Sequence, residues 1–473
     1  MSYPIRIITR ITLELEGPCR IGTGEDTAES DMPFVVDASG LPALPGSSLA
    51  GLLRAKLREH DGIEEAERWF GASRASQNPE ASRVCVSWAH VHDEKDCPVD
   101  GRLHPEDRSD FLHKIAVGEV RDHVRIDHRG TADDGGKFDR QLLYAGTRFS
   151  FEIEIVADED ERDDAEAIRD ELLALLHGPS TRLGSGKHSG FGAFRVVRAK
   201  GRVFDLRDGD DFTAYTETSP ALDEEPDFRA LEIPGRDAVG TELAIIKVEL
   251  TPETFFLVGG GDVIEGADEP DGAKIAPVKT RRINWYTGRG TFYDSEMAYL
   301  PATSIKGAIS HRVAFHANRL MKNFATGEKK LNEYSGENNP VIQSLFGFCR
   351  DEAVEDEANS GVGRVVIDDV ALEGRGRKKM IHISTDPFTG GVRHGFLFTE
   401  EAFNPGGSPI EFTIAVEQPQ KLSDREREAL KLTLEDLTSG RLAIGSGAGR
   451  GNGRFQGDFD WPAQLESTQE VSA

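Results

Sequence analysis

A ten-residue glycine pattern occurs twice in this chain. Residues 183–192 read LGSGKHSGFG and residues 444–453 read IGSGAGRGNG, so that four glycines recur at the same spacing. Two other pairs of segments echo each other in the same order, 45–51 with 301–307 and 146–151 with 407–412. Collinear repeats with so long a period indicate two copies of one domain joined in tandem.

The length of 473 residues accommodates two such domains, each with a hydrophobic core. We expect the first domain at residues 1–207 and the second at 241–473, with an acidic, Pro-containing linker at 208–240. Apolar periodicity in each copy predicts the order strand, helix, strand, strand, helix, strand. This order is the ferredoxin-like pattern. The expected fold class is therefore α+β, with two tandem ferredoxin-like domains.

Composition excludes several classes of protein. No stretch approaches the roughly 20 apolar residues of a membrane span, and the N-terminus does not have the pattern of a secretory signal. The four cysteines lie far apart in sequence and give no disulfide framework, which suits a reducing compartment. We expect a cytoplasmic protein with no membrane partner.

The distribution of charge is more informative than its sum. The chain has 83 acidic and 56 basic residues, a net charge of −27, which at first argues against a nucleic-acid partner. Residues 181–198 and 441–454, however, contain basic residues and not one carboxylate. An acidic chain with basic loops suits selective anion binding, although an acidified proteome in a salty habitat would also explain the composition.

The glycine loops do not match known nucleotide-binding fingerprints. A Walker phosphate loop would need glycine at Thr181 and Ser or Thr at His188, and a dinucleotide fingerprint would need glycine at Arg450. Two interpretations remain. The glycines bring backbone amides close to an anion, with Lys187, His188 or Arg450 alongside, or they form a tight turn that needs positive φ.

Hydroxyl residues stand at the start of a predicted helix in each copy. A helix N-terminus favours phosphate, and basic residues extend from the same helices. For the hydroxyls alone, capping of the helix is the alternative explanation. The predicted phosphate-binding residues of these helices are Ser47, Ser48, Arg54, Thr303, Ser304 and Lys306.

One short segment has the residue types of a zinc site. Cys85, His90, His92 and Cys97 offer two thiolates and two imidazoles, which are the ligands of tetrahedral structural zinc. Their spacing is not that of a standard zinc finger. The alternative is a buried cysteine beside surface histidines.

The order of several motifs closely resembles the RAMP superfamily of CRISPR systems, and within it the crRNA-binding backbone subunits of type III (Csm/Cmr-like) effectors. The resemblance covers nearly all of the first copy, and the other copy resembles a divergent repeat of it. The motifs are DMPFVVD at 31–37, LPGSSLAGLLR at 44–54, WFG at 69–71, VRID at 124–127 and the loop at 183–192, with LPATSIKG at 300–307, LFG at 345–347 and VVIDD at 365–369 in the second copy.

This resemblance implies a modified RRM domain that holds the phosphates of a guide RNA and inserts a thumb-like hairpin between bases. The excursions at 101–140 and 374–394 are too long for ordinary connections and would supply the two thumbs. Arg125, Arg129 and Lys378 would reach RNA from them. The implied partners are crRNA, complementary target RNA and other type III subunits, including a large polymerase-like one.

By the same resemblance, Asp31 would support metal-dependent cleavage of target RNA. The adjacent 2′-hydroxyl would attack the distorted phosphodiester, with Mg²⁺ or Mn²⁺ stabilising the developing charge. Aligning Pro277 and Val278 with Pro33 and Phe34 places Ile275 at this position of the second copy, with Asp271 nearby as a weaker candidate.

Other functions remain open from the sequence. A non-catalytic scaffold that positions crRNA is the main alternative to an endoribonuclease. A crRNA-processing ribonuclease is less favoured, because no histidine-based site is marked. Without the flanking motif, Asp31 would be a solvated turn residue.

Overall fold

The computed structural model describes residues 3–23, 32–72, 80–127, 130–224, 227–236, 243–259, 274–293, 297–324, 334, 336–349 and 360–466. Across these ranges it is a mixed α+β structure with several antiparallel sheets. No helix in the described ranges combines the length and apolar character needed to cross a membrane.

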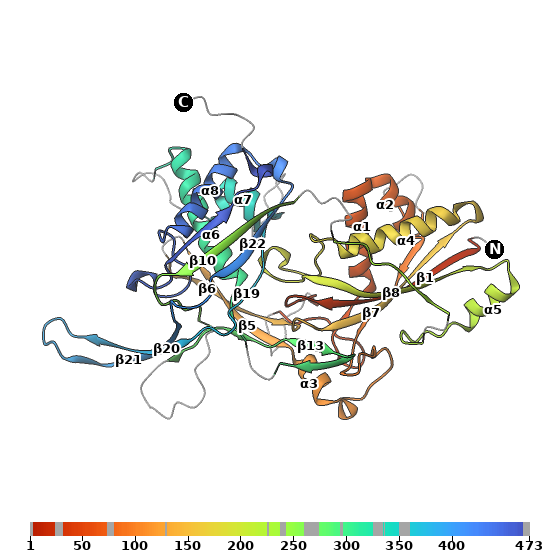
Figure 1. Cartoon of the computed structure of the whole chain (residues 1–473), viewed down its shortest axis with the longest axis horizontal. Coiled ribbons are helices and arrows are strands. Elements are labelled where there is room, and N and C mark those ends of the chain that lie inside the picture. The colour runs from red at the N-terminus through yellow and green to blue at the C-terminus, as the bar shows by residue number, and fades with distance from the viewer. Residues whose placement is uncertain are drawn as a thin grey trace.

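The first unit is a sheet of the order β2-β4-β7-β1-β8-β9, in which β3 also pairs with β7. Helices α1, α2 and α4 lie together on one side of it (Figure 1) and bury Trp69 and Leu172 against the strands. The elements are β1 (Ile5–Leu15), β2 (Ala43–Leu44), α1 (Gly46–Asp61), α2 (Ile63–Phe70), β3 (Val84–Val86), β4 (Ala89–Val91), α3 (Asp110–Val117), β5 (Glu119–Ile126), β6 (Ala132–Leu142), β7 (Arg148–Ala157), α4 (Arg162–His177), β8 (Phe194–Asp205), α5 (Gly209–Glu217) and β9 (Arg229–Ala230).

The second unit is a smaller sheet of the order β18-β22-β10-β23, with its own apolar core against α6, α7 and α8. The elements are β10 (Leu243–Pro252), β11 (Lys274–Ile275), β12 (Lys279–Thr280), β13 (Ile283–Tyr286), β14 (Arg289–Phe292), β15 (Met297–Leu300), α6 (Ala302–Leu320), α7 (Pro340–Phe346), β16 (Gly347–Cys349), β17 (Ser360–Val362), β18 (Val365–Ile367), β19 (Val370–Ala371), β20 (Arg377–Thr385), β21 (Val392–Phe403), β22 (Ile410–Glu417), α8 (Asp424–Thr438) and β23 (Phe455–Asp460).

The main strands of the two sheets are arranged alike. Numbered in chain order, the four principal strands lie 2-3-1-4 in each sheet, all with antiparallel neighbours. The registers also correspond, because Leu15 pairs with Phe194 as Pro252 pairs with Phe455. The repeated sequence segments therefore occupy matching places in two similar sheets.

Each excursion contains a β-hairpin. Strands β5 and β6 pair from Glu119 to Leu142 in the first unit, and β20 and β21 pair from Arg377 to Phe403 in the second. The second hairpin projects away from both sheets (Figure 1), and Phe388 near its tip is 96% exposed.

The segment predicted as a linker is structured over most of its length. Helix α5 contacts β8, and β9 extends the first sheet beside it. Arg10, whose side chain is buried on β1, donates to the carbonyls of Ser219, Ala221 and Glu224. These carbonyls attach the segment to the first unit, although its acidic composition indicated only a solvated connection.

A hairpin from the second half of the chain packs into the first unit. Ile283 of β13 is buried in the first core, and its backbone amide donates to the carbonyl of Ala145 at 2.9 Å. Trp285 Nε1 donates to the carbonyl of Gly146 at 2.7 Å, and its ring lies 6.1 Å from that of Phe111. The two units are thus joined by side-chain burial as well as by the chain.

We predict that Trp285→Ala lowers the free energy of unfolding by about 2 kcal/mol, because a half-buried indole and its hydrogen bond are lost. Urea unfolding followed by fluorescence and circular dichroism measures the change. Tyr286→Ala is the matched control, since that neighbouring ring is 67% exposed. Equal stabilities of the two variants would contradict the proposed packing role.

Candidate functional site

Both glycine loops are tight turns in which the four shared glycines have positive φ. A Cβ on Gly192 (φ 78°) would lie 1.9 Å from the carbonyl oxygen of Leu183, and one on Gly453 (φ 74°) would lie 2.3 Å from that of Ile444. Side chains cannot be accommodated at such approaches without backbone movement. Turn geometry therefore accounts for the repeated glycines.

Several loop amides already have protein acceptors. Ser185 N donates to the carbonyl of Arg20 at 2.9 Å, and Ser446 N donates to that of Leu257 at 2.7 Å. Leu183 and Ile444 donate across their own loops to Gly192 and Gly453. Binding of an anion at either loop would thus depend mainly on side chains, and of the two interpretations of the sequence the tight turn is favoured over the cradle of amides.

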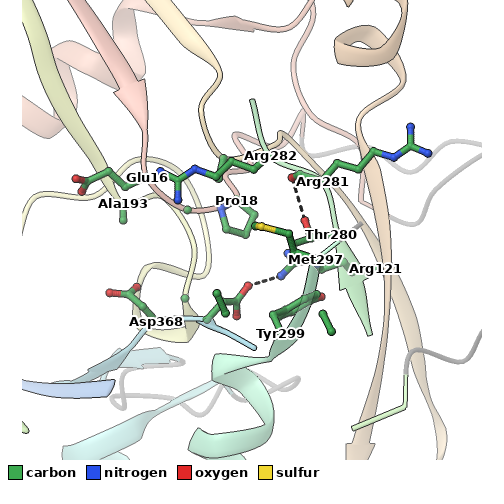
Figure 2. Close-up of a pocket in the computed structure, with 16 residues that line it drawn as sticks. Glu16, Pro18, Arg121, Ala193, Thr280, Arg281, Arg282, Met297, Tyr299 and Asp368 are labelled. Carbon is green, nitrogen blue, oxygen red and sulfur yellow. Dashed lines mark hydrogen bonds and ion pairs between the residues drawn. The ribbon is translucent and has the colours of Figure 1, made fainter. Parts of the chain in front are cut away.

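The first glycine loop forms a joint with the second unit. Arg182 makes two contacts with the carboxylate of Asp368, at 2.6 and 2.8 Å. Arg121 of β5 contacts Asp369 Oδ2 at 2.6 Å and lies over the ring of Tyr299, 4.3 Å from its centroid. A pocket of about 210 Å³ lies at this joint, and residues of both units line it (Figure 2).

The two helix N-termini differ. In α6, the amide of Ala302 donates to Asp369 Oδ1 at 2.8 Å, so a protein carboxylate occupies the place that the sequence suggested for phosphate. Thr303 and Ser304 are half-buried there. In α1, Ser47 and Ser48 are exposed and neither side chain caps the helix.

Two lysines at the joint are largely buried, and Glu417 is near enough to Lys187 to oppose part of the lowering of its pKa. Burial and the nearby Lys56 lower the pKa of Lys187, and burial lowers that of Lys306 to about 8. Lys306 Nζ donates to the carbonyl of His188 at 3.0 Å. No carboxylate in the described part of the chain forms an ion pair with either lysine, whereas His188 Nε2 lies 3.3 Å from Glu417. The joint thus holds desolvated cations from both units.

The second glycine loop is largely exposed, whereas the first lies against the other unit. Arg450 Nη2 contacts Glu400 Oε2 at 2.7 Å, and His382 Nε2 lies 2.9 Å from the other oxygen of the same fully buried carboxylate. The remaining predicted RNA-binding residues are spread over the two units. Lys378 is exposed on β20, Arg125 is exposed on β5, Arg54 is half-buried on α1, and Arg129 lies outside the described residues.

The four predicted zinc ligands do not converge. His92 is buried, and its ring nitrogens contact Asp96 at 2.8 Å and Ser150 at 2.7 Å. Cys85 and Cys97 are exposed, and His90 Nδ1 lies 3.9 Å from Asp37. The histidine that burial would favour as a ligand is therefore already held by protein groups.

A different group has the spacing of metal ligands, and no sequence pattern indicated it. Donor atoms of His60, Asp61 and Glu171 lie within 4.8 Å of one another, at the end of α1 and in α4. Burial and the adjacent Asp61 raise the pKa of Glu171 to about 7. The residues come together only through helix packing, since Glu171 is remote in sequence from the other two.

The predicted catalytic aspartates Asp31 and Asp271 both lie outside the described residues. The strand pairing of neighbouring residues nevertheless shows how the two copies align in this region. Gly22 pairs with Phe34 in the first unit, and Gly259 pairs with Pro277 in the second. Pro277 thus corresponds to Phe34, which shifts the alignment by one residue and places Lys274 opposite Asp31. Neither Lys274 nor Ile275 supplies a carboxylate.

Comparison with known proteins agrees with the duplicated architecture. The RAMP superfamily model matches residues 12–195 and 254–456, one region in each unit. The chain therefore belongs to the RAMP superfamily. It is also 30% identical over 164 residues to the CRISPR system Cms endoribonuclease Csm3 of Methanocaldococcus jannaschii, a match that covers 31% of this chain and 62% of that protein. The chain thus matches less than two thirds of that relative's length.

We predict that Gly192→Ala lowers the free energy of unfolding by about 2 kcal/mol or more, because the new methyl would meet the carbonyl of Leu183 at positive φ. Gly449→Ala is the matched control, since nothing lies within 4 Å of a Cβ there. Urea denaturation should separate the two variants. A Gly192 variant as stable as the control would argue against the turn interpretation.

We predict that Lys306→Met stabilises the chain at pH 7 by up to about 3 kcal/mol, because a buried ammonium is removed. The folded pKa of about 8 lies below the ordinary value of 10.5, so the folded chain binds fewer protons between these values. The lysine's contribution to the free energy of unfolding should therefore rise from pH 8 to 10.5, and should be lost in the variant. Urea titrations at about pH 7 and 9 measure both effects.

The exposed Lys421 supplies a control for this experiment, and Lys421→Met should leave stability nearly unchanged. A loss of stability in Lys306→Met would contradict the assignment of an unfavourable buried cation.

Proposed function

We propose that this chain is a crRNA-binding backbone subunit of a type III CRISPR effector complex, which holds guide RNA and cleaves the paired target RNA. The observation that carries the proposal is the pair of lysines at the joint. The chain has a net charge of −27, yet these lysines form no ion pair among the described residues. Burying an unpaired ammonium group costs folding free energy, and a bound anion would offset that cost. RNA phosphates are anions that would run past both units.

The fold supports this proposal. The strand order 2-3-1-4 in each unit is that expected for tandem ferredoxin-like domains, here in the modified RRM form of the family. The hairpins β5–β6 and β20–β21 would be the thumbs. Lys378 and Arg125 are exposed on them and could reach a nucleic acid backbone without breaking an ion pair described above.

The relative named an endoribonuclease supports RNA cleavage, for which we propose Asp31. The 2′-oxygen would attack the adjacent phosphorus while the bond from phosphorus to the 5′-oxygen breaks, leaving a cyclic phosphate and a 5′-hydroxyl. Asp31 would accept or orient the proton of the attacking hydroxyl. Carboxylate oxygen suits Mg²⁺ or Mn²⁺, either of which would stabilise the developing negative charge when bound.

The proposed partners are crRNA, target RNA and other type III subunits, including a large polymerase-like subunit. The second glycine loop supports a protein neighbour on that side, because the equivalent first loop is covered by a folded unit. In the second unit, Lys274 at the aligned position and Asp271 outside the described residues give weaker grounds for cutting. We therefore propose one cutting site in the first unit.

We predict that Asp31→Asn abolishes cleavage of target RNA in the complex assembled with crRNA and its partner subunits, while crRNA binding changes less than about threefold. Denaturing gels of labelled target, with Mg²⁺ or with EDTA, measure cleavage, and filter binding measures affinity. Asp271→Asn is the matched control and should cut normally. Undiminished cleavage by Asp31→Asn would favour the non-catalytic scaffold instead.

A further inference from the structure

A second group of cations lies at the base of the first hairpin, apart from the joint lysines. Arg140 on β6 lies over the rings of Phe138 and Phe191, 5.0 and 5.6 Å from their centroids. His123 on β5 stacks on Phe138, with centroids 5.3 Å apart. Arg20 comes from the segment after β1. Burial lowers the pKa of Arg140, and the positive charge of Arg20 lowers it further. Three separate segments thus bring basic groups together.

The two arginines have no carboxylate partners among the residues that the structure describes. Arg20 donates to the carbonyl of Met32 at 3.0 Å and to Ser185 Oγ at 3.1 Å, both uncharged acceptors. Within the same ranges Arg140 contacts aromatic rings, and its Nε is buried with no hydrogen-bond partner. Both guanidinium groups remain charged at neutral pH, even though burial lowers their pKa values.

Two neighbouring side chains show how this differs from ordinary pairing. Arg121, on the same hairpin, is compensated by Glu119 and Asp369. Burial and the two arginines Arg140 and Arg121 lower the pKa of His123 to about 4, so that its ring is neutral at pH 7. Within this group of described residues, positive charge without a counterion is therefore confined to Arg20 and Arg140.

The second unit has an uncharged residue at one corresponding position and an acid at the other. The bridges Cys19 with Leu143 and Phe256 with Phe403 occupy matching places, which makes Leu257 the counterpart of Arg20 and Glu400 that of Arg140. Glu400 is fully buried and forms an ion pair with Arg450 of its own unit at 2.7 Å, while His382 Nε2 lies 2.9 Å from its other oxygen. The second hairpin has one half-buried arginine at its base, Arg375, which lies over the ring of Phe256 and donates to the carbonyls of Gly406 and Ser408. It stands at a different position, so the described residues of the second unit hold no counterpart of the pair formed by Arg20 and Arg140.

We propose that Arg20 and Arg140 form a subsite for one RNA phosphate at the base of the first hairpin, built from an arginine pair that the second unit does not repeat. The inference rests on the proposed function, since RNA is the polyanion expected along this face. Guanidinium groups bind phosphate through charge-assisted, often bidentate hydrogen bonds. Arg20 also donates to the carbonyl of Met32, the residue that follows Asp31 in sequence.

The test uses full-length chain with Arg20→Gln, Arg140→Gln and the double substitution. Binding of a labelled single-stranded RNA is measured at several salt concentrations. We expect the double variant to weaken binding at least tenfold and to reduce the salt dependence by about one to two phosphate contacts. Arg140→Lys, which keeps the charge, should retain more affinity than Arg140→Gln. The control is Arg207→Gln, an exposed arginine paired with Asp205.

Inorganic phosphate separates the subsite from the RNA function. Phosphate should raise the melting temperature of the wild type more than that of the double variant. Without phosphate, the melting temperature of the double variant should be no lower than that of the wild type, because the substitutions remove unpaired charges. Stabilisation that depends on Arg20 and Arg140, in a wild-type chain that binds no RNA, would support the subsite and overturn the proposed function. RNA affinity and phosphate stabilisation both unchanged in the double variant would overturn the subsite.

Discussion

The carboxylate of Asp369 holds together the parts on which the arrangement of the two units depends. One oxygen accepts the first free amide of α6, and the other contacts Arg121 on the hairpin of the first unit. Gly190 lies against the same group, so that a side chain on this loop residue would meet both Asp369 and Ala302. A single acid thus satisfies a helix end, compensates an arginine and fixes the loop of one unit against the other.

Much of this architecture can be predicted from sequence, because repeats and periodicity are local or collinear signals. The glycine loops and the helices after Pro45 and Pro301 lie where the pattern indicated, and both excursions contain the hairpins that the family resemblance implied. The role of the glycines could not be predicted from the sequence, since a turn with positive φ and a loop that binds an anion both favour glycine. The structure distinguishes the two, because loop amides such as those of Ser185 and Ser446 donate to carbonyls of the protein.

Other features depend on contacts that no sequence pattern reports. The segment at 208–236 is acidic and aperiodic, yet its carbonyls are bound by Arg10, a residue far earlier in the chain. The two cysteines and two histidines at 85–97 resembled zinc ligands because they are close in sequence, but the ring of His92 is buried and contacts Ser150. The alignment of the proposed catalytic segment was wrong by one residue, because Pro33 and Pro277 match each other by residue type but do not occupy the same place in the strand pairing.

The packing of β13 and β14 into the first core means that the two copies have ceased to be interchangeable modules. A chain divided at the junction would leave the first half with an uncovered apolar surface around Phe111, and the second half with an exposed indole. Loss of one repeat would therefore leave the other with an apolar surface exposed to water. The two copies resemble each other in fold, but this small hairpin makes the first depend on a segment of the second.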